Sequence, residues 1–175
     1  MLFRSLALGK QPASMLDLGT GSGAIALALK FRMPEARVFA VDSDLSALVT
    51  AKRNAAKLNL DIDFRHGRWF EPVAGERFSL IVSNPPYVAS GDPHLGALRF
   101  EPRRALVAGP DGMDAMREIT SAAGAFLQPG AWLLLEHGFG QENAVRELLA
   151  RAGLESVTTW PDLAGIARVS GAKLK

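Results

Sequence analysis

Short apolar runs alternate along the chain with longer stretches in which apolar residues recur every three or four positions. Runs of the first kind are typical of buried strands, and stretches of the second kind are typical of amphipathic helices. This alternation favours an α/β fold with a mostly parallel sheet. The strands that the apolar runs predict cover residues 14–18, 37–41, 61–66, 78–83, 131–136, 154–160 and 166–170.

The periodic stretches predict helices between these strands, and local signals mark several helix ends. Asp44 can cap a helix that runs to about residue 58, because its carboxylate can accept from the free amides of the first turn. Gly153 is a suitable residue to close the last helix. The other predicted helices cover residues 24–31, 111–126 and 141–152, and a turn is expected at 128–130. The apolar positions expected on the buried side of the capped helix are Leu45, Leu48, Val49, Ala55 and Leu58.

Composition excludes several classes of chemistry. The chain contains no cysteine, which excludes disulfides, zinc–thiolate sites, iron–sulfur clusters and a cysteine nucleophile. His66, His94 and His137 show no metal-ligand spacing, so we expect no metal site. The length of 175 residues predicts one domain over residues 1–175, with 1–13 as a lead-in segment.

Charge and hydropathy bear on location and partners. No apolar run approaches the ~18 residues of a membrane span, and residues 1–10 do not form a signal peptide. The net charge of +2 is too small for a strong nucleic-acid field. We therefore expect a monomeric, cytoplasmic protein that binds neither membrane nor nucleic acid directly. Arg99, Glu101 and Arg103 are either a recognition element or an ordinary salt-bridge cluster.

A glycine loop directly after the first predicted strand is the strongest local signal. Three alternate glycines let the backbone pass close to a ligand, and the loop opens a helix, so we expect its amides to face outward. In methyltransferases such a turn lies under the amino-acid part of S-adenosylmethionine. Asp42 ends the next strand, where an acid can bind both ribose hydroxyls. The residues expected at this cofactor are Asp17, Gly19, Thr20, Gly21, Ser22, Gly23 and Asp42.

A dinucleotide-binding Rossmann loop is the alternative interpretation of this segment. The spacing G-x-G-x-G differs from the G-x-G-x-x-G of dinucleotide enzymes, and an acid precedes the loop. Both features favour S-adenosylmethionine, and in that interpretation Asp17 either faces the methionine ammonium or fixes the amides of the loop. A tight turn without any ligand is the remaining interpretation.

The tetrapeptide Asn84-Pro85-Pro86-Tyr87 follows the fourth predicted strand, at the sheet edge where ligands bind in α/β folds. The Asn84 side-chain carbonyl and the Pro85 carbonyl can accept the two hydrogens of a planar –NH2 group. Such fixed dipoles stabilise charge that develops on nitrogen during attack on a sulfonium methyl group. Tyr87 can stack on the flat substrate, so we expect catalysis and substrate binding at residues 84–87. A proline turn that merely ends the strand is the alternative.

These motifs resemble the catalytic domain of the release factor glutamine N5-methyltransferases, the HemK or PrmC family. The resemblance covers residues 15–169, and the segments that carry it are DLGTGSGAIALAL, VDSD, WF, IVSNPPY, DPHL, RFEP, ALVAG with DGM, and LLLEHG followed by Gln141. It implies a class I, Rossmann-like methyltransferase with a seven-stranded sheet, helices on both faces and an antiparallel closing strand. It also implies S-adenosylmethionine at residues 19–23, Asp42, Trp69 and Asn84.

The resemblance further implies a substrate, the Gly-Gly-Gln glutamine of a class I peptide chain release factor, bound at residues 84–87. N-P-P-Y alone is shared with enzymes that methylate the amino groups of adenine, cytosine and guanine, so a nucleic-acid amino methyltransferase stays an alternative. A noncatalytic cofactor-binding scaffold is a third hypothesis.

This sequence departs from the pattern of the family in three places. The N-terminal helical domain that grips the release factor is not found in this chain, and the spacing from DPHL to RFEP is short. Arg68 stands where the family usually has an acid near the adenine amino group. Trp69, which follows it, is expected to pack on adenine, with a core tryptophan as the alternative. Glu136 ends a strand beside the site, where we expect it to hold loop amides.

Overall fold

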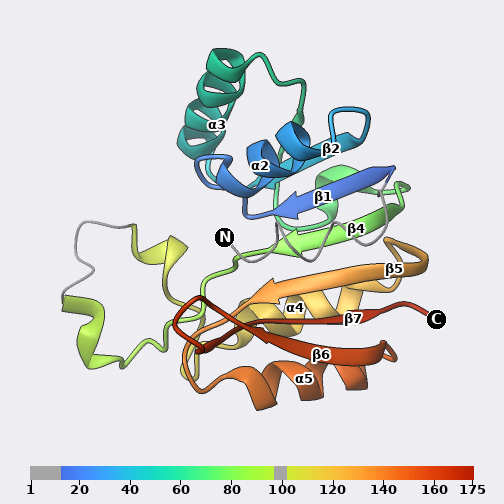
Figure 1. The fold of residues 1–175 in the computed structure, drawn as a ribbon. Helices are drawn as coiled ribbons and strands as arrows, with labels where there is room; N and C mark the ends of the chain where they lie inside the picture. The colour runs from blue at the N-terminus through green and yellow to red at the C-terminus, as the bar shows by residue number, and fades with distance from the viewer. Residues whose placement is uncertain (1–12, 97–101) are drawn as a thin grey trace.

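A seven-stranded sheet forms the centre of the molecule in the computed structural model, which describes residues 13–96 and 102–175 (Figure 1). The strand order is β3-β2-β1-β4-β5-β7-β6. All neighbouring pairs from β3 to β5 are parallel, and β7 is antiparallel to both of its neighbours. The strands are β1 (Ser14–Leu18), β2 (Arg37–Asp42), β3 (Asp63–His66), β4 (Phe78–Ser83), β5 (Leu127–Glu136), β6 (Glu155–Pro161) and β7 (Ala167–Lys173). The predicted fold class is confirmed, including the antiparallel closing strand.

Helices cover both faces of the sheet because the strands are apolar on both sides. Alternate residues of β2 enter different cores: Val38 belongs to the cluster that includes residues of α2, and Phe39 belongs to the cluster that includes residues of α4 and α5. The helices are α2 (Ala24–Arg32), α3 (Leu45–Leu58), α4 (Asp114–Ala123) and α5 (Glu142–Arg151). The described residues also form three short 3₁₀ helices, η2 (Glu71–Val73), η3 (Pro93–Gly96) and η4 (Arg103–Ala105). The fold therefore has three layers, with the sheet in the middle.

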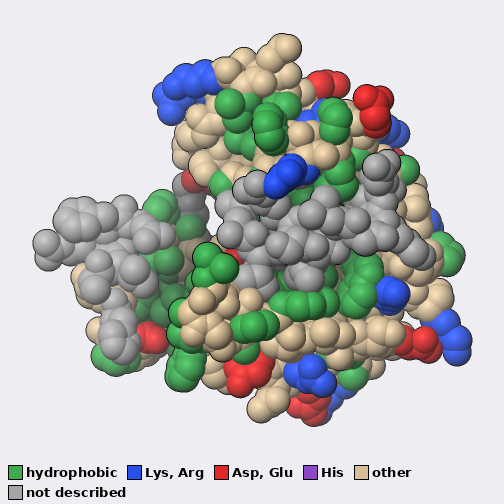
Figure 2. Space-filling view, in the orientation of Figure 1, with side chains coloured by type: hydrophobic (Ala, Val, Ile, Leu, Met, Phe, Trp, Pro, Cys, Tyr) green, Lys and Arg blue, Asp and Glu red, His purple; other side chains and the backbone are tan. Residues whose placement is uncertain are grey.

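Helix α3 begins as predicted but buries a different face. Asp44 caps it, and the carboxylate accepts from the Ser46 amide at 2.9 Å. Leu48 and Ala55 are buried as expected, whereas three other expected core residues are exposed: Leu45 at 61%, Val49 at 68% and Leu58 at 57%. Figure 2 shows hydrophobic side chains at the surface in the region of α2 and α3.

The physical reason for this error is the close approach of α3 to the glycine loop. A Cβ placed on Gly23 would lie 3.1 Å from the Ala51 Cβ, so only a small residue fits on that side of the helix. Ala51 is fully buried, and it forms the inner face together with Leu48 and Ala55. Leu45, Val49 and Leu58 are therefore turned outward although they are more apolar than alanine.

Two predicted boundaries near β5 are also wrong. The helix expected over 111–126 spans only Asp114–Ala123, because Gly112 takes a left-handed φ of 75° that no helix continues through. The turn expected at 128–130 lies inside β5, where the pairing with β4 loses its register between Phe78 and Leu80. Gly153 follows the end of α5 with a φ of 75°, as predicted.

The connection between β4 and α4 extends away from the carboxyl edge of the sheet (Figure 1). Its two arms are joined by a bridge between Val88 and Val107 and by the bond from the Ser90 amide to the Gly109 carbonyl, 2.9 Å. This connection is thus locally ordered in its described parts. None of the helices within the described ranges is long and apolar enough to cross a membrane.

Candidate functional site

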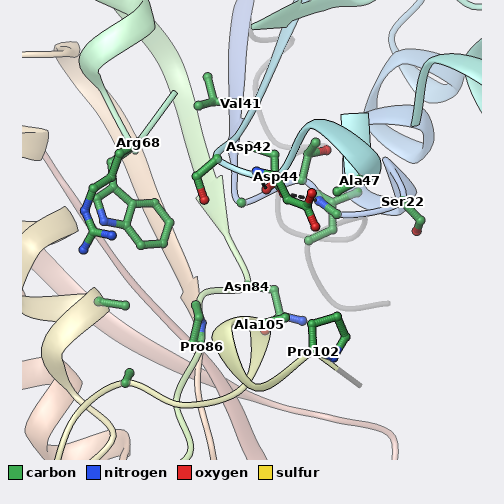
Figure 3. Close-up of a pocket in the computed structure, with 18 of the residues that line it drawn as sticks. Ser22, Val41, Asp42, Asp44, Ala47, Arg68, Asn84, Pro86, Pro102 and Ala105 are labelled. Atoms are coloured by element: carbon green, nitrogen blue, oxygen red, sulfur yellow. Dashed lines mark hydrogen bonds between the residues drawn. The ribbon is translucent and has the colours of Figure 1, made fainter. Parts of the chain in front are cut away.

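A cleft of about 1240 Å³ opens at the carboxyl ends of β1, β2 and β4 (Figure 3). The glycine loop after β1 and the start of α3 form one wall, and the segments that follow β4 form the other. Parallel strands end at one edge of the sheet, so these distant parts of the sequence converge there. Residues that line the cleft include Gly19, Thr20, Gly21, Ser22, Asp42, Trp69, Asn84 and Pro86. The structure therefore brings most of the predicted site residues together.

The backbone amides of the glycine loop donate hydrogen bonds that hold the loop in place. Its three glycines have φ values of 69°, 58° and 86°, which a residue with a Cβ rarely adopts. The amides of Gly19 and Thr20 both donate to the Val41 carbonyl, at 2.9 and 3.0 Å. The Gly21 amide donates to Asp42 Oδ2 at 2.8 Å, and the Gly23 amide donates to the Thr20 carbonyl at 2.9 Å. The expectation that the loop amides face outward is wrong for these four, because the protein itself holds them.

Asp17 lies beneath this loop and is fully buried. Its Oδ2 accepts from the Thr20 hydroxyl at 2.7 Å and from the Ala26 amide at 3.1 Å, which joins β1, the loop and the first turn of α2. Burial raises the pKa of Asp17 to about 6, against the opposing effect of these two hydrogen bonds. Asp17 does not line the cleft. This geometry matches the interpretation in which Asp17 fixes the loop.

Asp42 serves the loop and the cleft at the same time. Its Oδ2 accepts from Gly21, and its Oδ1 accepts from the Asp44 amide at 2.8 Å (Figure 3). Each carboxylate oxygen can accept more than one hydrogen bond, so the side chain can also receive donors from the cleft that it lines.

Trp69 has features of both predicted roles, a ring that packs on adenine and a core tryptophan. It lines the cleft, and it also packs against the core cluster. A Cβ on Gly19 would lie 3.5 Å from Trp69 Cζ3, so the indole stands directly beside the glycine loop. Its φ of 46° is unusual for a bulky residue.

Arg68 is held beside this indole by an acid from another helix. The guanidinium carbon lies 5.6 Å from the Trp69 ring centroid. Arg68 also forms a two-pronged ion pair with Glu118 of α4, with 2.8 Å between Nε and Oε1. The hydrogen bonds from Arg68 lower the pKa of Glu118. Glu118 was not predicted, because nothing in the local sequence relates it to a residue 50 positions earlier.

The four residues of the N-P-P-Y motif have different environments. Asn84 is exposed in the cleft, and Pro86 lines the cleft beside it (Figure 3). Pro85 is buried, and Tyr87 is half-buried against the core cluster. The Ser83 hydroxyl donates to the Leu18 carbonyl at 2.7 Å and so fixes the start of the motif next to β1.

Further cleft residues come from elements that the sequence did not relate to the site. Ser46, Ala47 and Thr50 of α3 line the cleft, as does Asp114 at the start of α4. Glu136, which was expected beside the site, also lines the cleft, and burial raises the pKa of this carboxyl while the Arg168 charge opposes the shift. The bonds found among the described residues include none from a loop amide to Glu136. Arg99 and Glu101 lie outside the residues that the structure describes. Within the described residues, no group of three His, Asp or Glu side chains is placed to hold a metal ion.

Comparisons with known proteins give consistent results. The methyltransferase small domain family matches residues 2–99. The chain is 55% identical over 157 residues to a release factor glutamine methyltransferase of Xylella fastidiosa, covering 88% of this chain and 57% of the relative. A relative of the same name from Yersinia pestis is 49% identical over 166 residues, covering 93% of this chain and 60% of the relative. The chain thus spans a little over half the length of these relatives.

Solved structures share the fold. A methyltransferase from Pyrococcus furiosus has a TM-score of 0.76 at 20% identity, covering 98% of this chain and 79% of that chain. The Thermus thermophilus 16S rRNA N2 G1207 methyltransferase, solved with AdoMet and guanosine, has a TM-score of 0.68 at 25% identity, covering 93% of this chain and 37% of that chain.

The buried carboxylate of Asp17 gives a prediction about stability and pH. Its pKa is raised, so the folded state holds this proton more tightly than the unfolded state. The stability advantage of the parent over Asp17→Asn should therefore be largest near pH 4. It should fall by up to about 3 kcal/mol as the pH rises through about 6. Denaturant unfolding of both proteins across this range measures the difference.

Asp162→Asn is the matched control for that experiment. Hydrogen bonds from the Ile166 and Ala164 amides lower the pKa of Asp162, with burial opposing them, so the pH trend should have the opposite sign. A stability difference for Asp17→Asn that does not change with pH would contradict the raised pKa.

Proposed function

The chain belongs to the methyltransferase small domain family, and from this premise we propose that it is an S-adenosylmethionine-dependent enzyme that methylates the side-chain nitrogen of a protein glutamine. The proposed substrate and partner is a class I peptide chain release factor, at the glutamine of its Gly-Gly-Gln segment. The observation that carries the proposal is the cleft in which Asn84 faces the braced glycine loop and Asp42. Relatives about half identical to the chain carry the name of this activity. A monomer acting in the cytoplasm fits such a substrate.

The charge of the cleft favours S-adenosylmethionine over a dinucleotide. Its lining includes the carboxylates of Asp42, Asp44, Asp114 and Glu136. Among the described lining residues the only guanidinium is that of Arg68, and it is paired with Glu118. S-adenosylmethionine carries a sulfonium and an ammonium against one carboxylate, whereas the pyrophosphate of NAD is anionic. An acidic cleft attracts the first ligand and repels the second.

The shape of the loop also suits this cofactor. A Cβ on Gly21 would meet nothing within 4 Å, so the loop presents open space at that position. We propose that the amino-acid part of the cofactor lies over residues 19–23, with the ribose at Asp42 and the adenine against Trp69. When bound, S-adenosylmethionine supplies the reactive methyl group on sulfur.

The residues of the chain then have to activate a poor nucleophile. An amide nitrogen shares its lone pair with the carbonyl, so its N–H bonds must be held while the lone pair turns toward the methyl group. We propose that the Asn84 side-chain oxygen and the Pro85 carbonyl accept these two hydrogens. Tyr87 does not line the cleft, and we propose that it helps to position the planar group by holding the motif. Fixed acceptors of this kind stabilise the positive charge that develops on nitrogen. No general base is required, because the product nitrogen can release its proton to water afterwards.

A nucleic-acid amino methyltransferase is the second candidate. The likeness to the guanosine-bound rRNA enzyme favours it, and an N-P-P-Y motif is compatible with both substrate classes. The net charge of +2 gives little attraction for phosphate backbones. Release factor, DNA and RNA offered side by side with labelled cofactor distinguish the two candidates.

Asp42 provides a test of cofactor binding. Asp42→Ala should weaken S-adenosylmethionine binding by on the order of 2–4 kcal/mol, because two hydrogen bonds to a charged acceptor are lost. Titration calorimetry measures this change, and NADH should not bind either protein.

Asp42 also braces the Gly21 amide, so a second ligand separates the two effects. A cofactor analogue without a ribose hydroxyl should bind the parent more weakly than S-adenosylmethionine does. Asp42→Ala should not distinguish between the two ligands. If it discriminates between them as the parent does, the ribose assignment is wrong.

Trp69→Ala should weaken cofactor binding while the domain stays folded, because adenine loses its stacking surface. Trp132→Phe is the control, since that ring packs against Trp160 at 5.7 Å between centroids, outside the cleft. Calorimetry and thermal unfolding measure the two properties. Unfolding of Trp69→Ala with unchanged affinity in any folded fraction would favour the core interpretation.

Asn84 tests the chemistry. Asn84→Ala should lower the rate of methyl transfer to the release factor by at least ~10²-fold and change cofactor affinity much less. Asn84→Asp keeps one acceptor and should retain part of the activity. Mass spectrometry of the release factor should find one methyl group on the Gly-Gly-Gln glutamine. Full activity of Asn84→Ala would remove this residue from the mechanism, and cofactor binding without turnover on any substrate would support a noncatalytic scaffold.

A further inference from the structure

The side chain of Gln141, directly before α5, joins the end of β5 to the N-P-P-Y motif. Its Oε1 accepts from the Gly138 amide at 2.8 Å, and its Nε2 donates to the Tyr87 carbonyl at 2.9 Å. Tyr87 and Gln141 are 54 positions apart in the sequence. One amide group therefore links the last residue of the motif to the main scaffold of the sheet.

The backbone around this link is too crowded for side chains. A Cβ on Gly112 would lie 2.2 Å from the Tyr87 carbonyl oxygen and 2.9 Å from Gln141 Nε2. A Cβ on Gly138 would lie 2.9 Å from Gln141 Oε1 and 3.2 Å from Tyr87 Cδ2. None of these four residues lines the cleft. The contact is thus a support for the motif that lies outside the cleft itself.

Both ends of the motif are consequently held. Ser83 is bonded to β1 at the start, and the Tyr87 carbonyl is bonded to Gln141 at the end. Pro85 and Pro86 between them have fixed φ angles and no amide hydrogen, so they transmit the position of the two ends to Asn84.

We propose that Gln141 is a positioning residue for methyl transfer: through the Tyr87 carbonyl it sets where Asn84 and the Pro85 carbonyl stand relative to the substrate amide. This inference rests on the proposed function of the motif. A displacement of about 1 Å in such acceptors can lower a rate by ~10²-fold.

A simpler role for Gln141 is to cap α5, where its carbonyl accepts from the Val145 amide at 3.0 Å. Gln141→Glu separates the two roles. The glutamate keeps an oxygen for the Gly138 amide and keeps its backbone, but at neutral pH it turns a second oxygen toward the Tyr87 carbonyl. The donor is then lost, and two acceptors repel each other. At low pH the protonated carboxyl can donate again.

Tyr87 is the only tyrosine in the chain, which allows a readout that does not depend on activity. In protein labelled with 3-fluorotyrosine, one ¹⁹F resonance reports on this residue. We expect Gln141→Glu to shift or broaden the resonance at about pH 7 and to bring it back toward the parent position at about pH 5, as the new carboxyl takes up its proton. His137 Nδ1 lies 3.1 Å from the Gly138 carbonyl, and Glu142 is adjacent, but the parent carries both and corrects for their titration.

Gln128→Glu is the matched control for the charge. Gln128 Nε2 also donates to a backbone carbonyl, that of Arg77 at 3.2 Å, but Gln128 lies at the start of β5 and does not line the cleft. Its variant should leave the fluorine resonance and the rate unchanged.

Gly112→Ala and Gly130→Ala form a second pair. Both glycines have a left-handed φ, 75° and 74°, but a Cβ on Gly130 meets nothing within 4 Å. Only Gly112→Ala should move the resonance.

The kinetic prediction completes the test. Gln141→Glu should lower kcat for the release factor by ~10-fold or more at neutral pH, while the Kd for S-adenosylmethionine changes less than about twofold. An unchanged fluorine resonance, or a moved resonance with an unchanged kcat, would overturn the proposal. If the parent itself transfers no methyl group to a release factor, the proposed function fails, and the fluorine experiment still decides whether Gln141 holds the motif.

Discussion

The site depends on the hydrogen bonds that the buried carboxylate of Asp17 accepts from the Thr20 hydroxyl and the Ala26 amide. The turn from β1 into α2 contains three left-handed glycines, which favour no single conformation by themselves. The Asp17 carboxylate accepts from the Ala26 amide in the first turn of α2. Asp42, at the end of the neighbouring strand, accepts from the Gly21 amide in the turn itself. Two carboxylates from adjacent parallel strands therefore stabilise a backbone that has little intrinsic preference. The raised pKa of Asp17 reflects the desolvation that accompanies this arrangement.

The same construction recurs on the opposite wall of the cleft. The N-P-P-Y motif is held by Ser83 and Gln141, and close packing at Gly112 leaves no room beside the Tyr87 carbonyl. In both walls, the residues that support the backbone are bonded to it from outside the cleft or at its edge. Gly21 and Ser22, which line the cleft, can therefore be small, because neighbouring residues hold the loop in place.

Local signals in the sequence predicted much of this correctly. The bounds of β1 and β4 match the predicted runs, and Asp44 caps α3, because short apolar runs and N-cap residues act over a few positions. The buried face of α3 was predicted wrongly, since the contact between Gly23 and Ala51 depends on tertiary packing. The contact of Gln141 with Tyr87 was not predicted, because the two residues are 54 positions apart in the sequence. The bracing of the loop amides was missed because a glycine pattern shows where a backbone can approach a ligand and does not show which carbonyls are nearer.

Arg68 shows how a change in one residue is compensated at a distance. A guanidinium at the position where the resemblance implies an acid would oppose the negative charge of the cleft. Glu118 of α4 neutralises it with a two-pronged ion pair, while the guanidinium stays beside the Trp69 ring. Exposed ion pairs contribute little to stability, so the pair matters mainly for where the charge and the indole are held. The pair thus offsets the positive charge of Arg68, and the described lining of the cleft still includes the carboxylates of Asp42, Asp44, Asp114 and Glu136.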